Sequence, residues 1–170
     1  MIATVPAVIF PALESRLWII VPDSMDTKHL LFLCTGNYYR SRYAELLFNA
    51  RAAGLGLPWR ADSRGLHLAS GHGNVGPISP YAAYRLTQRG IDFTASERYP
   101  MQAADADFER AHLVIALKET EHRPMVEAYF PRWNDTIEYW RVDDIDVATP
   151  DQALTLIDAN VESLLQRLGR

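Results

Sequence analysis

The chain has 170 residues, a formal net charge of −4 and 48% hydrophobic residues, which is enough for one domain with its own core. The mildly acidic balance and the lack of any block of lysine and arginine argue against binding to nucleic acid or to a membrane surface. The only cysteine, Cys34, cannot form an internal disulfide, which favours a reducing, cytoplasmic location.

The N-terminal stretch, residues 1–24, is apolar at both ends but contains Pro6, Pro11 and the charged residues Glu14 and Arg16. It is too interrupted for a transmembrane helix, and it lacks the basic region that opens a signal peptide. We therefore expect an N-terminal extension over residues 1–24 and a compact domain over residues 25–170. The alternative is that the extension adds a strand or an arm to the domain.

From residue 25 onward, segments typical of strands and helices alternate. Short apolar runs predict strands, whereas apolar residues at helical spacing that stop near glycine or proline predict helices. The expected strands are residues 29–33, 59–63, 113–117 and 137–142, and the expected helices are residues 41–53, 80–89, 119–129 and 150–168.

This alternation predicts a single-domain α/β fold in three layers, with a four-stranded parallel sheet flanked by helices. In such sheets the ligand binds beyond the carboxyl ends of the strands, at the point where the strand order reverses. The first expected strand ends at Cys34, so this residue is a candidate for the site.

The segment CTGNYYRS, residues 34–41, joins the first expected strand to the first expected helix. Backbone N–H groups of such a loop can turn inward around an anion, and the helix N-terminus adds positive potential. Gly36 permits a positive φ, and Asn37 tolerates one better than most residues. Arg40 carries a planar fork that matches two oxygens of a tetrahedral oxyanion. The segment therefore predicts a phosphate-binding loop.

Cys34 is the expected nucleophile of this loop. The field that attracts a phosphate also stabilises a thiolate, which would lie beneath the bound phosphorus. Ser41 can donate a hydrogen bond to that thiolate. The competing interpretation is a small buried core residue, as most lone cysteines are. The spacing C-x5-R-S between a strand and a helix favours the reactive thiol.

The segment LLFLCTGNYYRSRYAE, residues 30–45, resembles the phosphate-binding loop of the low-molecular-weight protein tyrosine phosphatases, V-x-F-V-C-x-G-N-x-C-R-S-P-x-A-E. WRADS at residues 59–63, Arg98 and LVIAL at residues 113–117 follow in the family's order. The resemblance runs from residue 28 to the C-terminus. It implies a phosphatase that acts on phosphotyrosine or a related aryl phosphate, carried by a phosphorylated protein or a small molecule.

The resemblance also implies a phosphocysteine intermediate on Cys34, formed without a metal or another cofactor, because Arg40 and the loop amides stabilise the charge. Phosphate would be bound by Thr35, Gly36, Asn37, Tyr38, Tyr39, Arg40 and Ser41, with Ser63 supporting the loop.

In this family an aspartate of a D-P pair protonates the leaving group and then activates water. The matching stretch is YWRVDDIDVATP, residues 139–150, where Asp144 aligns best although Ile145 replaces the proline. Asp143 and Asp146 remain competing candidates for the acid.

Several residues depart from the family's pattern. Tyr39 replaces a second loop cysteine, so the protective disulfide of the family cannot form. Ala95 falls where many members have a histidine that braces the loop asparagine. We therefore expect Asn37 to rely on Ser63 and Ser41 instead.

Other residues have weaker implications for the site. The aromatic residues that usually clamp a phosphotyrosine ring are absent, and Tyr38 and Tyr39 could supply a replacement wall. Trp59 is the best tryptophan candidate for the pocket lining by its family position, and GHGNVG at residues 71–76 is expected to be a flexible connection near the site. The five histidines show no metal-ligand spacing and are expected at the surface or in loops.

Two other functions remain open. An arsenate reductase of the thioredoxin-coupled kind shares the fold and a CTGN loop, but it relays oxidation through further cysteines. This chain has only Cys34 and would need an external thiol. A non-catalytic module that binds phosphate or a phosphoprotein would keep the loop but lack a working acid, which the weak match around Asp144 and the change at Ala95 support.

Overall fold

The computed structural model describes residues 27–71 and 73–170, so the extension expected over residues 1–24 lies outside the described residues. The strands are β1 (Lys28–Cys34), β2 (Trp59–Gly65), β3 (Leu113–Ala116) and β4 (Ile137–Tyr139), and the helices are α1 (Arg40–Gly54), α2 (Pro80–Gln88), α3 (Asp105–Arg110), α4 (Glu119–Tyr129) and α5 (Pro150–Leu168).

Each of the eight segments expected from the sequence contains an element of the predicted type. The strand expected over residues 137–142 is shorter, because beyond Tyr139 the regular ladder gives way to an isolated bridge between Lys118 and Arg141. The sequence analysis missed α3, whose six residues are too few to show a helical period.

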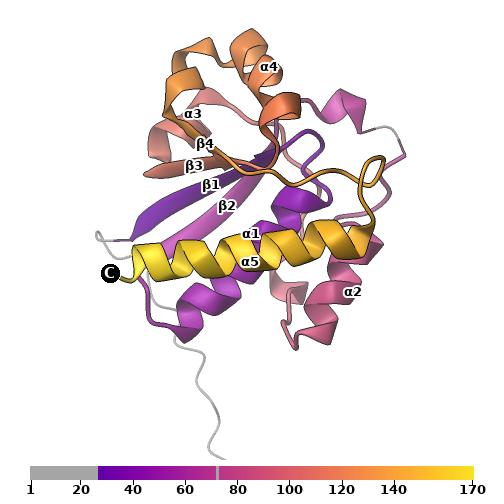
Figure 1. Ribbon diagram of the computed structural model, residues 1–170, viewed down its shortest axis with the longest axis vertical. Helices are drawn as coiled ribbons and strands as arrows, with labels where there is room; N and C mark the ends of the chain where they lie inside the picture. The colour runs from indigo at the N-terminus through magenta and orange to yellow at the C-terminus, as the bar shows by residue number, and fades with distance from the viewer. Residues whose placement is uncertain (1–26, 72) are drawn as a thin grey trace, which may run out of the picture.

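The four strands form one parallel sheet in the order β2-β1-β3-β4 (Figure 1). The chain passes from β1 to β2 on one side and then crosses to β3 on the other side. The carboxyl end of β1 therefore lies at the switch point, where parallel α/β sheets bind their ligands. This topology confirms the predicted four-stranded α/β fold.

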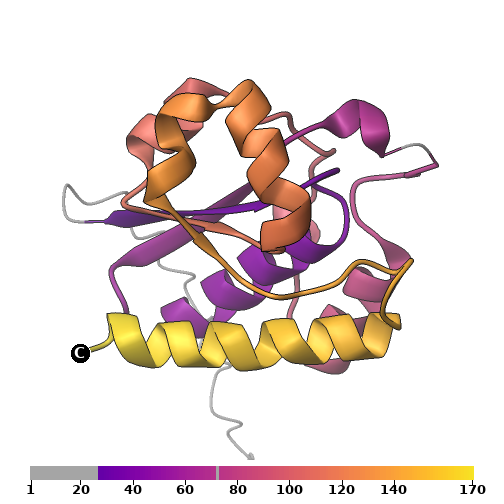
Figure 2. The ribbon, with the colours of Figure 1, turned by 45° about the horizontal axis from the view of Figure 1, so that its top comes forward.

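Helices α1, α2 and α5 cover one face of the sheet, and α3 and α4 cover the other (Figures 1 and 2). Leu30 and Phe32 of β1 belong to the core on the α1 and α5 side, whereas Leu31 and Leu33 belong to the core beneath α3 and α4. Because both of its faces are buried, β1 is a continuous apolar run rather than an alternating one.

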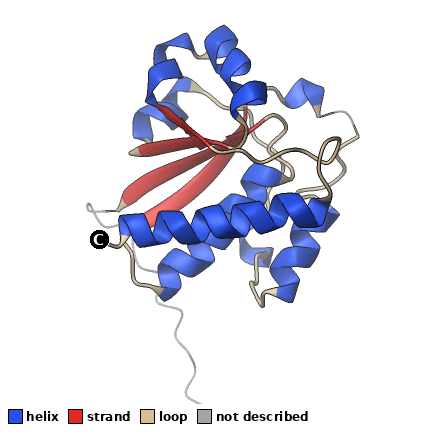
Figure 3. Ribbon diagram, in the orientation of Figure 1, coloured by secondary structure: helices blue, strands red, loops and turns tan. Residues whose placement is uncertain are grey.

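The loops that follow β1 and β4 lie on the same side of the molecule, beyond the ends of the strands (Figure 3). Helix α1 starts directly after the first of these loops, at Arg40. Among the helices of the described part of the chain, none combines the length and the hydrophobicity that crossing a membrane requires.

Candidate active site

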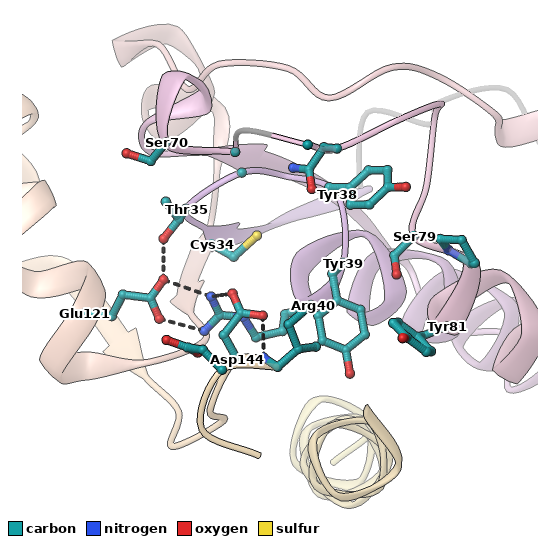
Figure 4. Close-up of a pocket in the computed structure, with 17 residues that line it drawn as sticks. Cys34, Thr35, Tyr38, Tyr39, Arg40, Ser70, Ser79, Tyr81, Glu121 and Asp144 are labelled. Atoms are coloured by element: carbon teal, nitrogen blue, oxygen red, sulfur yellow. Dashed lines mark hydrogen bonds and ion pairs between the residues drawn. The ribbon is translucent and has the colours of Figure 1, made fainter. Parts of the chain in front are cut away.

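A cavity of about 650 Å³ lies at the carboxyl end of β1 and is lined by Cys34, Thr35, Gly36, Tyr38, Tyr39 and Arg40. Four further segments complete its wall: the connection between β2 and α2, the first turn of α2, the first turn of α4, and the loop between β4 and α5 (Figure 4). The segment predicted to bind phosphate therefore surrounds one part of a cavity at the switch point.

Cys34 is the last residue of β1 and is 3% exposed, with its side chain on the cavity. Its Sγ lies 3.0 Å from Oγ of Ser41, which is in the first turn of α1. A hydroxyl at this distance can donate a hydrogen bond to a thiolate. Ser41 thus occupies the position that the sequence analysis expected for it.

Asn37 gives the loop its sharp turn, with a φ of 47°, the only positive φ at a non-glycine residue in the described part of the chain. Its fully buried amide makes four hydrogen bonds. Nδ2 donates to Oγ of Ser41 (3.1 Å) and of Ser63 (2.8 Å). Oδ1 accepts from Nη1 of Arg98 (2.9 Å) and from the backbone N–H of Met101 (2.9 Å). The expected support from Ser41 and Ser63 is therefore present in the geometry.

Arg98 supplies a brace that the sequence analysis did not assign. Besides Asn37, its guanidinium donates to the backbone oxygen of Ser63 (2.7 Å) and pairs with Glu45 (3.1 Å). Oε2 of Glu45 also accepts a hydrogen bond from Oγ of Ser63 (2.5 Å) and pairs with Arg42 (2.8 Å). These contacts join the phosphate-binding loop to α1, β2 and the segment after α2.

Arg40 is 1% exposed and is held at both ends of its fork. Nη1 and Nη2 each donate to one carboxylate oxygen of Glu121 at 2.8 Å, and Nη2 also pairs with Asp144 at 2.5 Å. The backbone oxygen of Val142 accepts from Nη1 at 3.3 Å. Burial alone would lower the pKa of Arg40, but Glu121, the Cys34 sulfur and Asp144 together raise it, so the guanidinium stays charged.

Glu121 is the site residue that the sequence analysis missed. It projects from the first turn of α4 into the cavity and accepts a hydrogen bond from Oγ1 of Thr35 (Figure 4). Burial alone would raise its pKa, but the neighbouring His122 and Arg40 hold the pKa of Glu121 well below its usual range. Glu119, two residues earlier, is a glutamate of the same turn that pairs with Arg123 at the surface. No sequence pattern therefore distinguishes Glu121 from it.

The three aspartates of the loop between β4 and α5 take different positions. Asp143 forms an ion pair with Lys118 and does not line the cavity. Asp144 and Asp146 both line the cavity, and Asp144 contacts Arg40. The geometry therefore favours Asp144 over Asp143 as the group nearest to the loop arginine.

The tyrosines form the opposite wall (Figure 4). Tyr38 donates a hydrogen bond to the backbone oxygen of Val75 (2.7 Å), and Tyr39 donates one to that of Pro150 (3.1 Å). Burial, with Asp144 nearby, raises the pKa of Tyr39 to about 12, so this hydroxyl remains a donor at neutral pH. The half-exposed ring of Tyr81 packs edge-on against Tyr39 and extends this wall.

Two expectations about individual residues are wrong. Trp59 does not line the cavity, because it is the first residue of β2 and so lies at the opposite end of the strand, under Nζ of Lys28. His122 is not at the surface but is a fully buried residue of α4.

Two further parts of the expected site differ in whether they line the cavity. Asn37 and Ser41 are among the expected phosphate-binding residues, but their fully buried side chains support the loop and do not line the cavity. The connection over residues 71–76, by contrast, contributes Gly71, Gly73 and Asn74 to the cavity wall, as its expected position near the site requires.

Comparison with known proteins identifies one family that matches most of the chain. The family described as low molecular weight phosphotyrosine protein phosphatase matches residues 29–170. A search of curated proteins finds no significant match.

Several solved structures share the fold of this chain. YfkJ from Bacillus subtilis is 24% identical with a TM-score of 0.72, covering 84% of this chain and 95% of that chain. A low molecular weight protein tyrosine phosphatase from T. tengcongensis is 29% identical with a TM-score of 0.62, covering 80% and 99%. The YwlE arginine phosphatase, in a mutant with a phosphorylated active-site serine, is 24% identical with a TM-score of 0.64, covering 82% and 92%.

Proposed function

Because the chain belongs to the low molecular weight phosphotyrosine protein phosphatase family, it is a phosphatase, and we propose that it hydrolyses phosphotyrosine or aryl phosphate monoesters through a phosphocysteine on Cys34. The observation that carries this proposal is the meeting of Cys34, the fork of Arg40 and the carboxylate of Asp144 on one cavity. The partner would be a phosphorylated protein or a small aryl phosphate. A lone catalytic thiol fits the reducing conditions of the cytoplasm.

In the first step the thiolate of Cys34 attacks phosphorus, so that an S–P bond forms while the bond from phosphorus to the leaving oxygen breaks. Asp144, in its protonated form, gives its proton to that oxygen. Arg40 and the loop amides hold the other phosphate oxygens, on which negative charge builds up. The products of this step are a phosphocysteine and a neutral alcohol or phenol.

In the second step Asp144 accepts a proton from a water molecule that attacks the phosphocysteine. The S–P bond breaks, and inorganic phosphate is released. Ser41 stabilises the departing sulfur anion, because its hydroxyl lies 3.0 Å from Sγ. The site then returns to its starting state, with Cys34 as a thiolate and Asp144 protonated.

Turnover of p-nitrophenyl phosphate and of a phosphotyrosine peptide tests the proposal. We expect Cys34→Ser to abolish turnover and Asp144→Asn to lower kcat about 100-fold or more, the usual contribution of a general acid. Asp143→Asn and Asp146→Asn are the matched controls. If either control loses more activity than Asp144→Asn, the acid is misassigned. Full activity of Cys34→Ser would exclude the phosphocysteine.

The same assay separates the two alternative functions. An arsenate reductase would consume arsenate when an external thiol is supplied, and a non-catalytic module would bind phosphate without turnover of either substrate. Turnover that depends on Cys34 without any added thiol excludes both as the main function.

The charges of the cavity favour a second substrate class. Arg40 is the only cation among the described lining residues, whereas Glu121 and Asp146 add two carboxylates besides Asp144, which starts the proposed cycle protonated. A positively charged leaving group, such as the guanidinium of phosphoarginine, would be attracted to them. YwlE, which shares the fold, is described as an arginine phosphatase. A higher kcat/KM for phosphoarginine than for phosphotyrosine would select this candidate.

A further inference from the structure

Glu121 binds the edge of Arg40 formed by Nη1 and Nη2, one of the edges by which a guanidinium can hold a phosphate. The two carboxylate oxygens meet Nη1 and Nη2 at 2.8 Å, in the two-point geometry by which a guanidinium also holds two oxygens of a phosphate. Asp144 also forms an ion pair with Nη2. The guanidinium is therefore bound by a carboxylate of the protein itself.

We propose that Glu121 is a specificity-determining residue, which competes with a phosphate for the guanidinium of Arg40 and thereby lowers the affinity for simple phosphates. The proposal rests on the proposed function only in placing the phosphate at Cys34 and Arg40. It differs from a purely structural role because it predicts that removal of the carboxylate tightens phosphate binding.

The structure provides other donors for the carboxylate once Arg40 is released. Oγ1 of Thr35 already donates to Oε1 of Glu121, and this bond does not involve the arginine. Nε2 of His122 lies 3.3 Å from the same oxygen but lacks the alignment of a hydrogen bond, and it has no hydrogen-bond partner among the described residues. A small movement of Glu121 would satisfy this fully buried nitrogen.

The tautomer of His122 is fixed by its second nitrogen. Nδ1 accepts a hydrogen bond from the backbone N–H of Lys118 at 2.9 Å, so Nδ1 carries no proton. In the neutral ring the proton must then be on Nε2, which makes this atom a donor that faces Glu121. A buried donor without a partner is costly, so its pairing with the displaced carboxylate would offset part of the loss of the contact with Arg40.

The exchange leaves a negative charge close to the bound phosphate. The structure pairs the charge of Glu121 with Arg40, but once a phosphate takes that position Arg40 is balanced by the phosphate. No second cation lines the described part of the cavity to balance Glu121. Because like charges repel strongly in a partly buried site, the carboxylate weakens phosphate binding.

Titration calorimetry with inorganic phosphate tests the proposal without any need for turnover. The variants are Glu121→Gln and Glu121→Ala. Glu119→Gln is the matched control, because it removes a solvent-facing carboxylate from the same turn of α4. We expect both Glu121 variants to bind phosphate about tenfold more tightly at pH 7, and the control to bind like the wild type. Thermal unfolding identifies any variant that fails to fold. If one Glu121 variant fails to fold, phosphate binding by the other one tests the proposal.

Kinetics gives an independent reading of the same proposal. Glu121→Gln is expected to lower KM for p-nitrophenyl phosphate more than it changes kcat. Equal or weaker phosphate binding by both folded variants overturns the proposal and makes Glu121 an anchor of Arg40. Tighter phosphate binding without any turnover in the wild type would keep this proposal and reject the proposed function, so the two can fail separately.

Discussion

Nη1 of Arg98 donates a 2.9 Å hydrogen bond to Oδ1 of Asn37, the residue at which the phosphate-binding loop turns to a positive φ. Arg98 thus holds Asn37 from outside the loop, in addition to the support from Ser41 and Ser63. The contact links the conformation of the loop to a network of charges that includes Glu45 and Asp62.

Replacement of Arg98 by alanine should therefore loosen the loop. We expect Arg98→Ala to lower the free energy of unfolding by about 2 kcal/mol, since hydrogen bonds to charged groups contribute about 1.5–3 kcal/mol, and to lower kcat/KM about tenfold or more. Arg110→Ala is the control, because Arg110 also pairs with Asp62 but is largely exposed. Denaturant unfolding and p-nitrophenyl phosphate turnover measure both effects. Equal losses in the two variants would contradict a specific role for Arg98.

Asn37 combines an unusual backbone angle with four hydrogen bonds, and two substitutions separate these contributions. Asn37→Ala loses the amide and must also adopt a left-handed conformation, which costs about 1–2 kcal/mol for most residues. Asn37→Gly loses the amide but tolerates the angle. We expect both variants to lose most activity, with the glycine variant unfolding at a higher temperature. An alanine variant that unfolds at a higher temperature than the glycine variant would show that residue 37 does not keep its positive φ.

Gly65 ends β2 directly beneath the phosphate-binding loop. A Cβ at this position would lie 2.5 Å from Cδ2 of Leu68 and 2.8 Å from the backbone oxygen of Thr35. We expect Gly65→Ala to destabilise the fold by about 1–3 kcal/mol through overpacking and to reduce activity by shifting the loop. Gly54→Ala is the matched control, because nothing lies within 4 Å of its added Cβ. Thermal unfolding of both variants checks the difference.

The contacts of Glu121 predict a pH dependence of stability. The pKa of Glu121 is lowered in the folded protein from its usual value near 4.5, so its charged form stabilises the fold above pH 4.5. This contribution is lost progressively as the pH falls below 4.5, because the unfolded chain then takes up a proton at Glu121 while the folded carboxylate stays charged to a much lower pH. Glu121→Gln should therefore be less stable than the wild type at pH 7, and the difference in unfolding temperature should shrink toward pH 3. A constant difference across this range would contradict the prediction.

The sequence predicted those parts of the structure that depend on neighbours along the chain. The strand before Cys34, the turn at Asn37 and the start of α1 form one continuous segment, so their geometry follows from local pattern and from the resemblance of that segment to a family. Asp144 was proposed as the acid from the same resemblance, and only the folded structure shows that Asp144 contacts Arg40 whereas Asp143 pairs with Lys118.

Residues whose role depends on the packing of distant elements could not be predicted. Glu121 and Glu119 are both glutamates in the first turn of α4, and only the orientation of that helix over the sheet decides which carboxylate reaches Arg40. The burial of His122 follows from the same orientation. Trp59 was misplaced because its family position was given more weight than its place at the start of the strand, which is the end opposite to the ligand site of a parallel sheet.

The proposed nucleophile and the proposed anion-binding groups lie within one stretch of eight residues, whereas Asp144, the proposed acid, lies 104 residues after Arg40 in sequence. Local opening of the loop between β4 and α5 would remove this proposed proton donor while β1 and α1 remain packed in the core. A molecule in that state could still capture a phosphorylated partner and protect it from other enzymes without releasing product. Protein dynamics in this one loop would then decide between catalysis and sequestration.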